Sequence, residues 1–388
     1  MTAQFNLGRV AGVCVILLLY LLFAVSLGSI ANWGQWALLG PPNHALLDSD
    51  FARLWYVGRH SLAEWGVMAP PPLLDGRDIL AARTAPVHAW LYPPTTTILA
   101  LPFALLPLPL AIWVWRVSNL CFAYLLLRRA GLPPFVVLAG VFSPAALGDL
   151  NGGQFGMLTG TLLTSALLCC EARPVLAGCL VGLLALKPQT ALVAPFAWAR
   201  WRFRLAFLAA LLAGLAFVAI SFLLIGSAAW VRYGGVGLVD AWAVPRAPFT
   251  ALFPVIGITV TYMARTLHAS LYWAGKVQFV SSICAIALIW RGWGQGVMVP
   301  LPRLAFTLCL GILATPYDFA YDLMGYSVAL AALGAKLSGW RCFAAWLLWL
   351  MGGFTVTLTN LTHLLLFPIF ALIGAALAWH VRHEPALQ

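Results

Sequence analysis

Residues 10–30 read VAGVCVILLLYLLFAVSLGSI, an apolar run without a charged side chain. A helix that crosses a bilayer needs about 20 such residues, so this run is long enough to span one. The run is also longer than the apolar core of a signal peptide, and the small-residue pattern of a cleavage site is weak. We therefore expect a membrane anchor here and not a cleaved leader.

The rest of the chain has the same character. Of its 388 residues, 63% are hydrophobic and 9% are charged, against about 25% charged residues in an ordinary soluble domain. This composition excludes a soluble globular enzyme, a disordered chain, a collagen-like chain and a coiled coil. It predicts an all-α, polytopic integral membrane protein that forms a single transmembrane domain over residues 1–388.

The charges predict how this domain is threaded. The chain carries 22 Lys+Arg against 11 Asp+Glu, a net charge of +11. Cations follow most of the apolar runs, and placing them in the cytoplasm gives a consistent path of about twelve crossings. Because no basic stripe with interleaved aromatic residues is present, nucleic acid is not an expected partner. The strongest of these cation markers are Arg128-Arg129, the cluster Arg200, Arg202 and Arg204, Arg291, and Arg382.

Acidic residues gather in one segment, residues 31–90, which we expect to be a long first non-cytoplasmic loop. It holds five of the 11 acids, namely Asp48, Asp50, Glu64, Asp75 and Asp78. Two later segments fit simple spans poorly. Pro94–Leu106 is short and bounded by prolines, so it is either spanning or re-entrant. Leu176–Ala199 is interrupted at Lys187-Pro188 and is either two short spans or a broken helix.

The motif Asp48-Ser49-Asp50-Phe51 is the first candidate for chemistry. A carboxylate near a membrane surface can act as a general base if burial or a neighbouring charge tunes its pKa. The second acid could supply that charge. Nearby Arg53 could grip a phosphate with its planar fork. The other arginines on the expected non-cytoplasmic side are candidates for the same role, namely Arg59, Arg77, Arg83, Arg232, Arg246 and Arg265. The alternative is a solvated loop acid or a helix cap.

Two polar turns follow. Tyr92-Pro93-Pro94 stiffens the entry to the next apolar run, and Tyr92 is either a substrate contact or part of a plain turn. In Asn151-Gly152-Gly153-Gln154, the glycines allow close backbone approach, and Gln154 offers both a donor and an acceptor. These groups suit a sugar hydroxyl, and they equally suit an ordinary turn between helices.

Lys187 stands inside an apolar segment, where a cation is costly and therefore a functional candidate. It could neutralise a lipid-linked phosphate, or it could snorkel to the membrane interface. The last motif, residues 315–322 (TPYDFAYD), places Tyr317, Asp318, Tyr321 and Asp322 between apolar runs. Asp318 and Asp322 would share one face if this segment were helical. Two carboxylates are too few ligands to predict a metal site, and we expect no cofactor.

Taken together, these motifs resemble the GT-C class of membrane glycosyltransferases, and within it family 87, the polyprenyl-phosphate-mannose-dependent mannosyltransferase-like proteins. The resemblance rests on five motifs in order and reaches from about residue 10 to residue 335. They are Asp50-Phe51 with Trp55 and Gly58, Tyr92-Pro93-Pro94, Gly153-Gln154, Lys187-Pro188, and Thr315-Pro316 leading to Tyr321-Asp322-Leu323.

The resemblance implies a GT-C-like fold with its active site on the periplasmic or extracellular face of a bacterial plasma membrane. It implies an inverting transfer of a sugar, usually mannose, from a polyprenyl phosphate to a lipid or glycan acceptor. The aspartate of the first loop is the general base in this family, and Asp50 matches its place. One branch of the family carries histidines near the end of the fifth motif, where this chain has Tyr321 and Asp322.

Two other classes compete with this interpretation. A transporter or lipid flippase would favour ionisable residues spread through the membrane and internal symmetry, and the two halves of this chain do not echo each other. A cell-envelope polymer ligase or polymerase would use a similar polyprenyl-linked donor.

Overall fold

The structure is a computed structural model that describes residues 50–71, 90–246 and 255–387. In these ranges the regular secondary structure is helical, and the one isolated β-bridge joins Gly257 and Phe319. The all-α prediction is thus confirmed for the described part of the chain. The expected span at residues 10–30 and the candidate Asp48 lie outside it.

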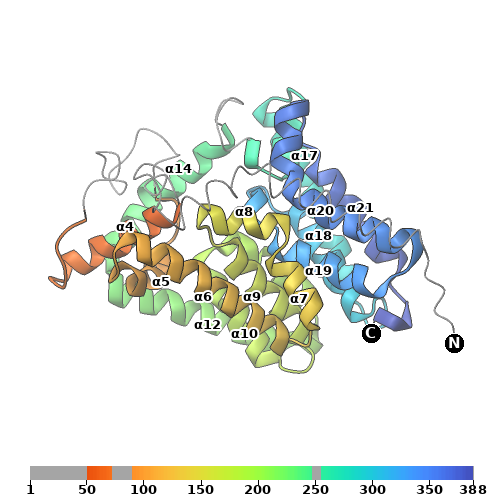
Figure 1. Cartoon of the computed structure of the whole chain (residues 1–388), viewed down its shortest axis with the longest axis horizontal. Coiled ribbons are helices and arrows are strands. Elements are labelled where there is room, and N and C mark those ends of the chain that lie inside the picture. Colours follow the sequence, from red (N-terminus) through yellow and green to blue (C-terminus); the bar gives the residue numbers. More distant parts are fainter. Residues whose placement is uncertain (1–49, 72–89, 247–254, 388) are drawn as a thin grey trace.

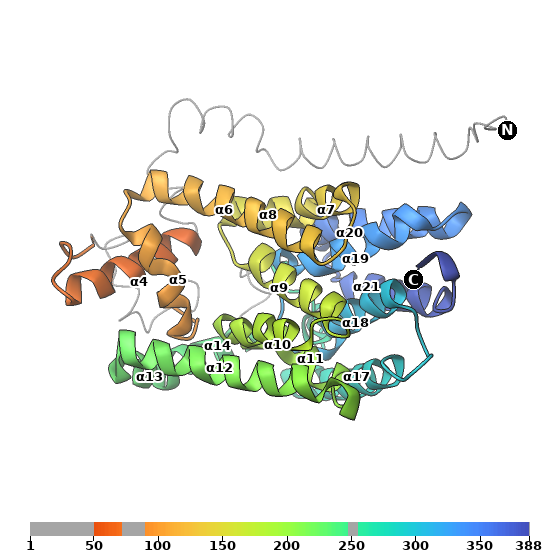
Figure 2. The same cartoon turned by 90° about the horizontal axis from the view of Figure 1, so that it is seen from below.

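The helices of the first half pack in succession, with α6 against α9, α9 against α10, and α10 against α12 (Figure 2). Their bounds are α4 (Asp50–Glu64), α5 (Thr95–Ala104), α6 (Leu108–Arg129), α7 (Pro134–Val141), α8 (Pro144–Gly152), α9 (Gly156–Cys169), α10 (Pro174–Gly182), α11 (Val193–Ala197), α12 (Arg204–Ile225), α13 (Ser227–Arg232) and α14 (Leu238–Ala243).

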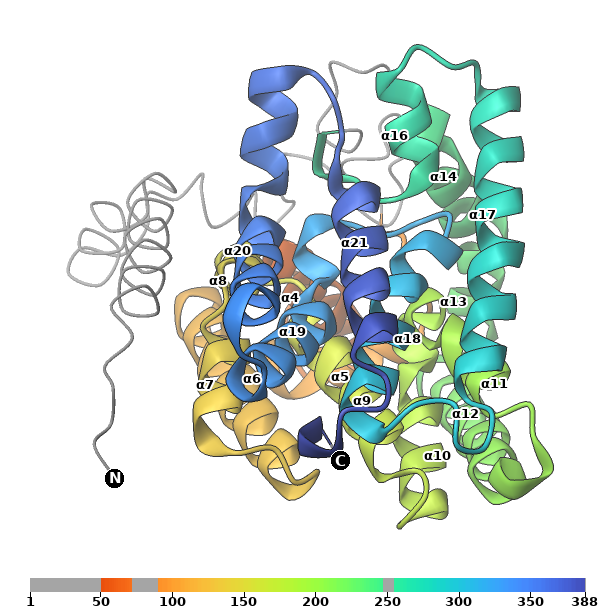
Figure 3. The same ribbon diagram turned by 90° about the vertical axis from the view of Figure 1, so that its right-hand side faces the viewer.

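In the second half, α18 lies centrally against α17, α19 and α21, and α19 packs on α20 (Figure 3). The two halves meet where α19 contacts α7 and α9. The bounds are α16 (Val260–Thr266), α17 (Leu271–Gly292), α18 (Pro300–Ala314), α19 (Met324–Lys336), α20 (Gly339–Thr362) and α21 (Phe367–His380).

The outer helices show that the protein is an integral membrane protein. Within the described ranges, four helices are long and apolar enough to cross a bilayer, namely α6, α17, α20 and the helix at Trp201–Ile225 that contains α12. Only 11% of the most apolar stretch of that last helix is buried. A helix that is apolar on all sides and yet exposed by the protein fold requires lipid around it.

The number of crossings is smaller, by length alone, than the twelve expected. Helices α7 and α8 form a fifth candidate span if the pair, bent by 51°, counts as one. Other apolar helices in the described ranges, among them α5, α9 and α18, have only 10–17 residues. Such helices are short for a bilayer of ordinary thickness, so a total of about twelve stays a prediction.

The segment at Leu176–Ala199 is interrupted at Lys187, as predicted, and its two arms form a hairpin instead of one broken helix that continues in the same direction. Helix α10 continues as a short 3-10 turn, the backbone breaks at Lys187 (φ −143°, ψ 76°), and α11 follows in the return direction. Both ends of this hairpin lie together, because Arg202 stands 3.9 Å from Glu171. Lys187 therefore lies at the tip of the hairpin, inside the bundle, and the chain returns to the end of the bundle where Glu171 and Arg202 lie.

Several of the basic helix ends meet at one end of the bundle. Arg303 forms an ion pair with Glu171 at 2.9 Å, Arg202 donates to the carbonyl of Trp293, and Arg200 donates to the carbonyl of Trp290. Helices α9, α17 and α18 each connect this end to the opposite one. At the opposite end, α4 and α5 pack together beside α6. Figure 1 shows α4 and α5 to the left of the α8 label.

Candidate functional site

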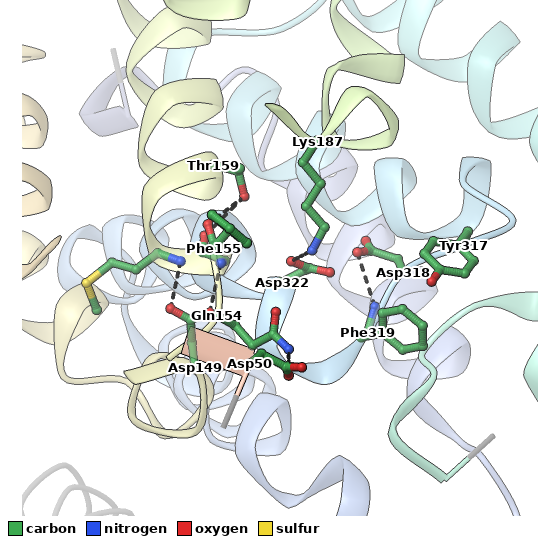
Figure 4. Close-up of polar contacts among 12 residues, drawn as sticks. Asp50, Asp149, Gln154, Phe155, Thr159, Lys187, Tyr317, Asp318, Phe319 and Asp322 are labelled. Atoms are coloured by element: carbon green, nitrogen blue, oxygen red, sulfur yellow. Dashed lines mark hydrogen bonds and ion pairs between the residues drawn. The ribbon is translucent and has the colours of Figure 1, made fainter. Parts of the chain in front are cut away.

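Asp50 is the first residue of α4, and its carboxylate receives two donors. The Nη1 atom of Arg53 lies 2.7 Å from Oδ1. The side-chain amide of Gln154 donates to Oδ2 (Figure 4). A negative charge at a helix N-terminus is also favoured by the helix dipole. One third of the Asp50 side chain is exposed, so the carboxylate is held in place while one side remains accessible.

The electrostatics of Asp50 combine opposing effects. Burial raises the pKa of the Asp50 carboxyl above its ordinary value, whereas the charges of Arg53 and Lys187 lower it. Burial has the largest effect of the three. The net effect is a raised pKa for the Asp50 carboxyl, while the two neighbouring cations still favour its charged form.

Gln154 joins Asp50 to Tyr92. The Tyr92 hydroxyl donates to Gln154 Oε1 at 3.0 Å, so the Gln154 amide nitrogen is the atom left to face Asp50. Gln154 stands in the turn between α8 and α9, directly after Gly153, which adopts a left-handed conformation (φ 67°). The predicted turn is confirmed at Gly153-Gln154, whereas Asn151 and Gly152 are the last residues of α8. The Gln154 side chain makes its contacts within the protein.

Two glycines of this turn let other site segments approach it. A Cβ atom on Gly153 would collide with Phe51, the neighbour of Asp50, and a Cβ atom on Gly156 would collide with the backbone carbonyl of Tyr321. The turn is therefore the place where the first and the fifth motif meet. The two motifs are far apart in the sequence, and they come together because the glycines allow close backbone packing.

Lys187 is buried and paired. Its ammonium forms an ion pair with Asp322, and the two side chains are 2% and 4% exposed. The ammonium also lies 4.9 Å from the ring centre of Tyr321, a cation–π contact. The snorkelling alternative is wrong, because the head group points into the bundle toward an acid and not toward the membrane interface.

Asp318 and Asp322 lie together, but not on a helix face. The chain is extended at Phe319 (φ −132°, ψ 161°), the carbonyl of Asp318 accepts from the amide of Ile258 at 3.1 Å, and a 3-10 turn covers Ala320–Asp322. The helical alternative is therefore wrong for this segment. Burial and the adjacent Asp322 both raise the pKa of the Asp318 carboxyl well above its ordinary value, which favours its protonated form.

A cavity of about 650 Å³ opens between these segments. Its polar wall and its apolar wall come from different parts of the chain. The predicted residues that line it are Asp50, Arg53, Tyr92, Gln154, Lys187, Tyr317 and Tyr321. The apolar wall is made mainly by α14 and α17, with Leu238, Ala241, Leu271, Gly275 and Phe279. Asp318 and Asp322 line a separate cavity of about 50 Å³ behind Lys187.

Among the arginines proposed to grip a phosphate, Arg53 and Arg246 line the large cavity. Arg59 donates instead to the carbonyl of Ala104 at 3.0 Å, and Arg232 lines a neighbouring small crevice. Arg77 and Arg83 lie outside the described residues. In the described ranges, no three His, Cys, Asp or Glu side chains come together as a metal site would need.

Sequence reasoning missed Asp149. It is 1% exposed, and its two carboxylate oxygens accept from the amides of Gly156 and Met157 at 2.8 and 3.0 Å. An acid that precedes a glycine-rich turn inside an apolar stretch is the signal that could have identified it, because an acid there needs internal partners.

The fold and the cavity define a class of protein, a helical integral membrane protein with an enclosed polar site. The model of glycosyltransferase family 87 matches residues 90–317, more than half of the chain, so this protein belongs to that family of GT-C glycosyltransferases. The matched range includes Tyr92, Gln154 and Lys187, begins after Asp50 and ends at Tyr317. Comparison with curated proteins and with solved structures found no match.

Replacing Gly156 with alanine should destabilise the protein, because the added methyl group would meet the backbone carbonyl of Tyr321. Overpacking of this kind reduces the free energy of unfolding by about 1–3 kcal/mol. Gly148, in α8, is the matched control, since a Cβ atom there meets no atom of the described part of the chain. Gly148→Ala should be neutral or stabilising by up to about 1 kcal/mol. Thermal unfolding in detergent measures both, and equal effects would contradict the close contact.

Breaking the buried ion pair should be strongly destabilising. Lys187→Met leaves Asp322 buried without its cation and should reduce the free energy of unfolding by about 3–5 kcal/mol. Because both side chains are buried, the double variant Lys187→Met/Asp322→Leu should recover most of that loss. Denaturant or thermal unfolding gives the comparison, and a double variant as unstable as the single one would argue against the pair.

Proposed function

We propose that this glycosyltransferase moves a sugar from a polyprenyl-phosphate donor to a hydroxyl of a lipid or glycan acceptor, with inversion at the anomeric carbon and Asp50 as general base. The observation that carries the proposal is the Asp50 carboxylate at the wall of the 650 Å³ cavity, held by Arg53 and Gln154.

The geometry of Asp50 suits a base. A carboxylate has more acceptor positions than the two that Arg53 and Gln154 occupy, so an acceptor hydroxyl can donate to it as well. A general base works best when its pKa lies near the working pH, and burial moves the pKa of Asp50 in that direction. In the reaction, the hydroxyl oxygen forms the new bond to the anomeric carbon, the bond to the phosphate oxygen breaks, and Asp50 takes the proton.

Cations of the cavity support a phosphate leaving group. Arg246 stands exposed at the cavity wall, and Lys187 lines the cavity while pairing with Asp322. A guanidinium matches phosphate geometry with two parallel donors, so Arg246 is the candidate for the direct contact. Lys187, whose charge is shared with Asp322, stabilises the developing phosphate charge from one side.

The apolar wall supports a lipid-linked donor. Leu271 and Phe279 on α17 are 38% and 66% exposed and line the same cavity as Asp50. Between them on this wall, Gly275 has open space where a Cβ atom would lie. Glycine weakens a helix relative to alanine by about 0.5–1 kcal/mol, and no neighbour among the described residues explains a glycine at this position. A lipid chain passing close to α17 would explain it.

The arrangement of charge supports a non-cytoplasmic site. The Glu171–Arg303 contact and the arginines beside it mark one end of the bundle, and Asp50 stands at the other. With the basic end in the cytoplasm, the cavity faces the periplasm or exterior of a bacterial plasma membrane. Mannose is the proposed sugar, on the family resemblance, and Tyr317 and Tyr321 are available to its hydroxyls.

Asp50→Asn should reduce transfer by about 10²–10⁴-fold, the usual contribution of a general base. The measurement is release of polyprenyl phosphate and formation of product from labelled donor with purified protein. Glu64→Gln is the matched control on the same helix, since its side chain is 55% exposed, and should keep full activity. Near-normal turnover of Asp50→Asn would remove Asp50 as the base.

The same assay separates transfer from transport. Protein in sealed vesicles should convert donor to product and free polyprenyl phosphate. Movement of intact donor across the vesicle membrane without its cleavage would favour the transporter or flippase interpretation.

Gly275→Phe should discriminate against long lipid chains. The added ring would fill the space beside α17, so turnover of long-chain donors should decrease by about tenfold or more, equivalent to about 1.4 kcal/mol. Donors with a short chain should be affected much less. Val277→Phe adds the same ring near the position, at a residue 47% exposed that does not line the cavity, and should change neither. Equal losses with long and short donors would argue against a lipid path at Gly275.

A further inference from the structure

The turn between α8 and α9 presents an electrostatic problem. The last carbonyls of α8 and the first amides of α9 meet there, and both sets lack partners within their own helices. The end of α8 carries a partial negative charge and the start of α9 a partial positive charge. Because the turn lies in the bundle, side chains must satisfy these groups.

Arg116 satisfies the end of α8. It extends from α6, is 4% exposed, and donates from Nε to the carbonyl of Leu150 at 2.9 Å and from Nη2 to the carbonyl of Asn151 at 3.2 Å. Its guanidinium also lies 5.0 Å from the ring centre of Trp113. A buried arginine on an apolar helix is costly, and here its charge faces the negative end of a helix.

Asp149 satisfies the start of α9 with its carboxyl oxygens. Its two oxygens accept from the amides of Gly156 and Met157, and its backbone carbonyl accepts from the amide of Gln154 at 3.2 Å. An arginine thus donates to one helix end and an aspartate accepts from the other. Gln154 is the residue fixed between them, and its side chain reaches Asp50.

We propose that Arg116 and Asp149 are positioning residues for the transfer reaction, which act by aiming the Gln154 amide at Asp50. The inference rests on the proposed function, because it takes Asp50 as the base. Neither side chain lines the large cavity, so both act through the turn and not on substrate. Displacing Gln154 moves the donor away from Asp50 Oδ2 and frees the carboxylate to rotate around its contact with Arg53.

The effect on proton transfer has a definite sign. A donor to a carboxylate favours its charged form, so loss of the Gln154 contact raises the pKa of Asp50. The base must be deprotonated to act, and the acid limb of the pH–rate profile therefore moves to higher pH. Among the described residues, the groups that interact electrostatically with Asp50 are Arg53, Lys187, Tyr92, Tyr317 and Tyr321. The variants below alter none of them.

The test compares Arg116→Gln and Asp149→Asn with the wild type in the transfer assay. We expect kcat to decrease about tenfold or more, the acid limb of kcat/KM to shift upward, and the KM for donor to stay within about twofold of the wild type. Arg116→Lys keeps the charge and one donor, so it should restore part of kcat. If the other two variants do not fold, the test is the kcat of Arg116→Lys compared with that of the wild type.

Arg303→Gln is the matched control. Arg303 is a buried arginine, 7% exposed, that pairs with Glu171 at the opposite end of the bundle. Its loss should lower the thermal unfolding temperature without changing kcat or the pH profile. If the Arg116 and Asp149 variants behave in the same way, their role is structural only and the inference fails. If Asp50→Asn retains activity, Asp50 is not the base and the proposed function fails. This outcome is distinct from failure of the positioning role, because it is seen in a different variant.

Discussion

Close backbone contact at the α8–α9 turn is the constraint on which the rest of the site depends. Gly153 admits Phe51 and Gly156 admits the carbonyl of Tyr321, so segments about a hundred and about 170 residues apart converge on one short turn. A side chain at either glycine would hold these segments apart. Asp50, Gln154 and Lys187 would then still be present in the sequence, but they would not surround one cavity.

Charge inside this assembly is matched locally. Asp50 has Arg53, Asp322 has Lys187, and Asp318 is driven toward its neutral form. This arrangement limits the cost of keeping ionisable groups in a largely apolar bundle, because a buried charge is tolerated only with a partner. It also leaves Arg246 exposed at the cavity wall, where it forms no ion pair with an acid of the described residues and is available for the proposed phosphate.

Much of this could be predicted from the sequence, because lipid imposes rules that are local. Apolar runs give helices, Lys187-Pro188 gives a break, and glycines before Gln154 give a turn. What could not be predicted depends on long-range pairing. Lys187 and Asp322 are 135 positions apart, so nothing nearby distinguishes a snorkelling lysine from a paired one. Arg116 was missed for the same reason, since the carbonyls that it holds are 34 and 35 positions away. Asp149 is different, because its partners are local and its place before a glycine-rich turn was a signal in the sequence. The 315–322 segment was open to a helical interpretation because its bridge to Gly257 is non-local.

The most direct test of the account is an experimental structure with a non-hydrolysable polyprenyl-phosphate sugar bound. The account predicts the anomeric carbon beside the Asp50 carboxylate, the phosphate on the far side of the sugar near Arg246 and Lys187, and the lipid chain over Gly275. A ligand bound elsewhere, or a sugar whose phosphate faces Asp50, would contradict the central claim that this cavity is the transfer site.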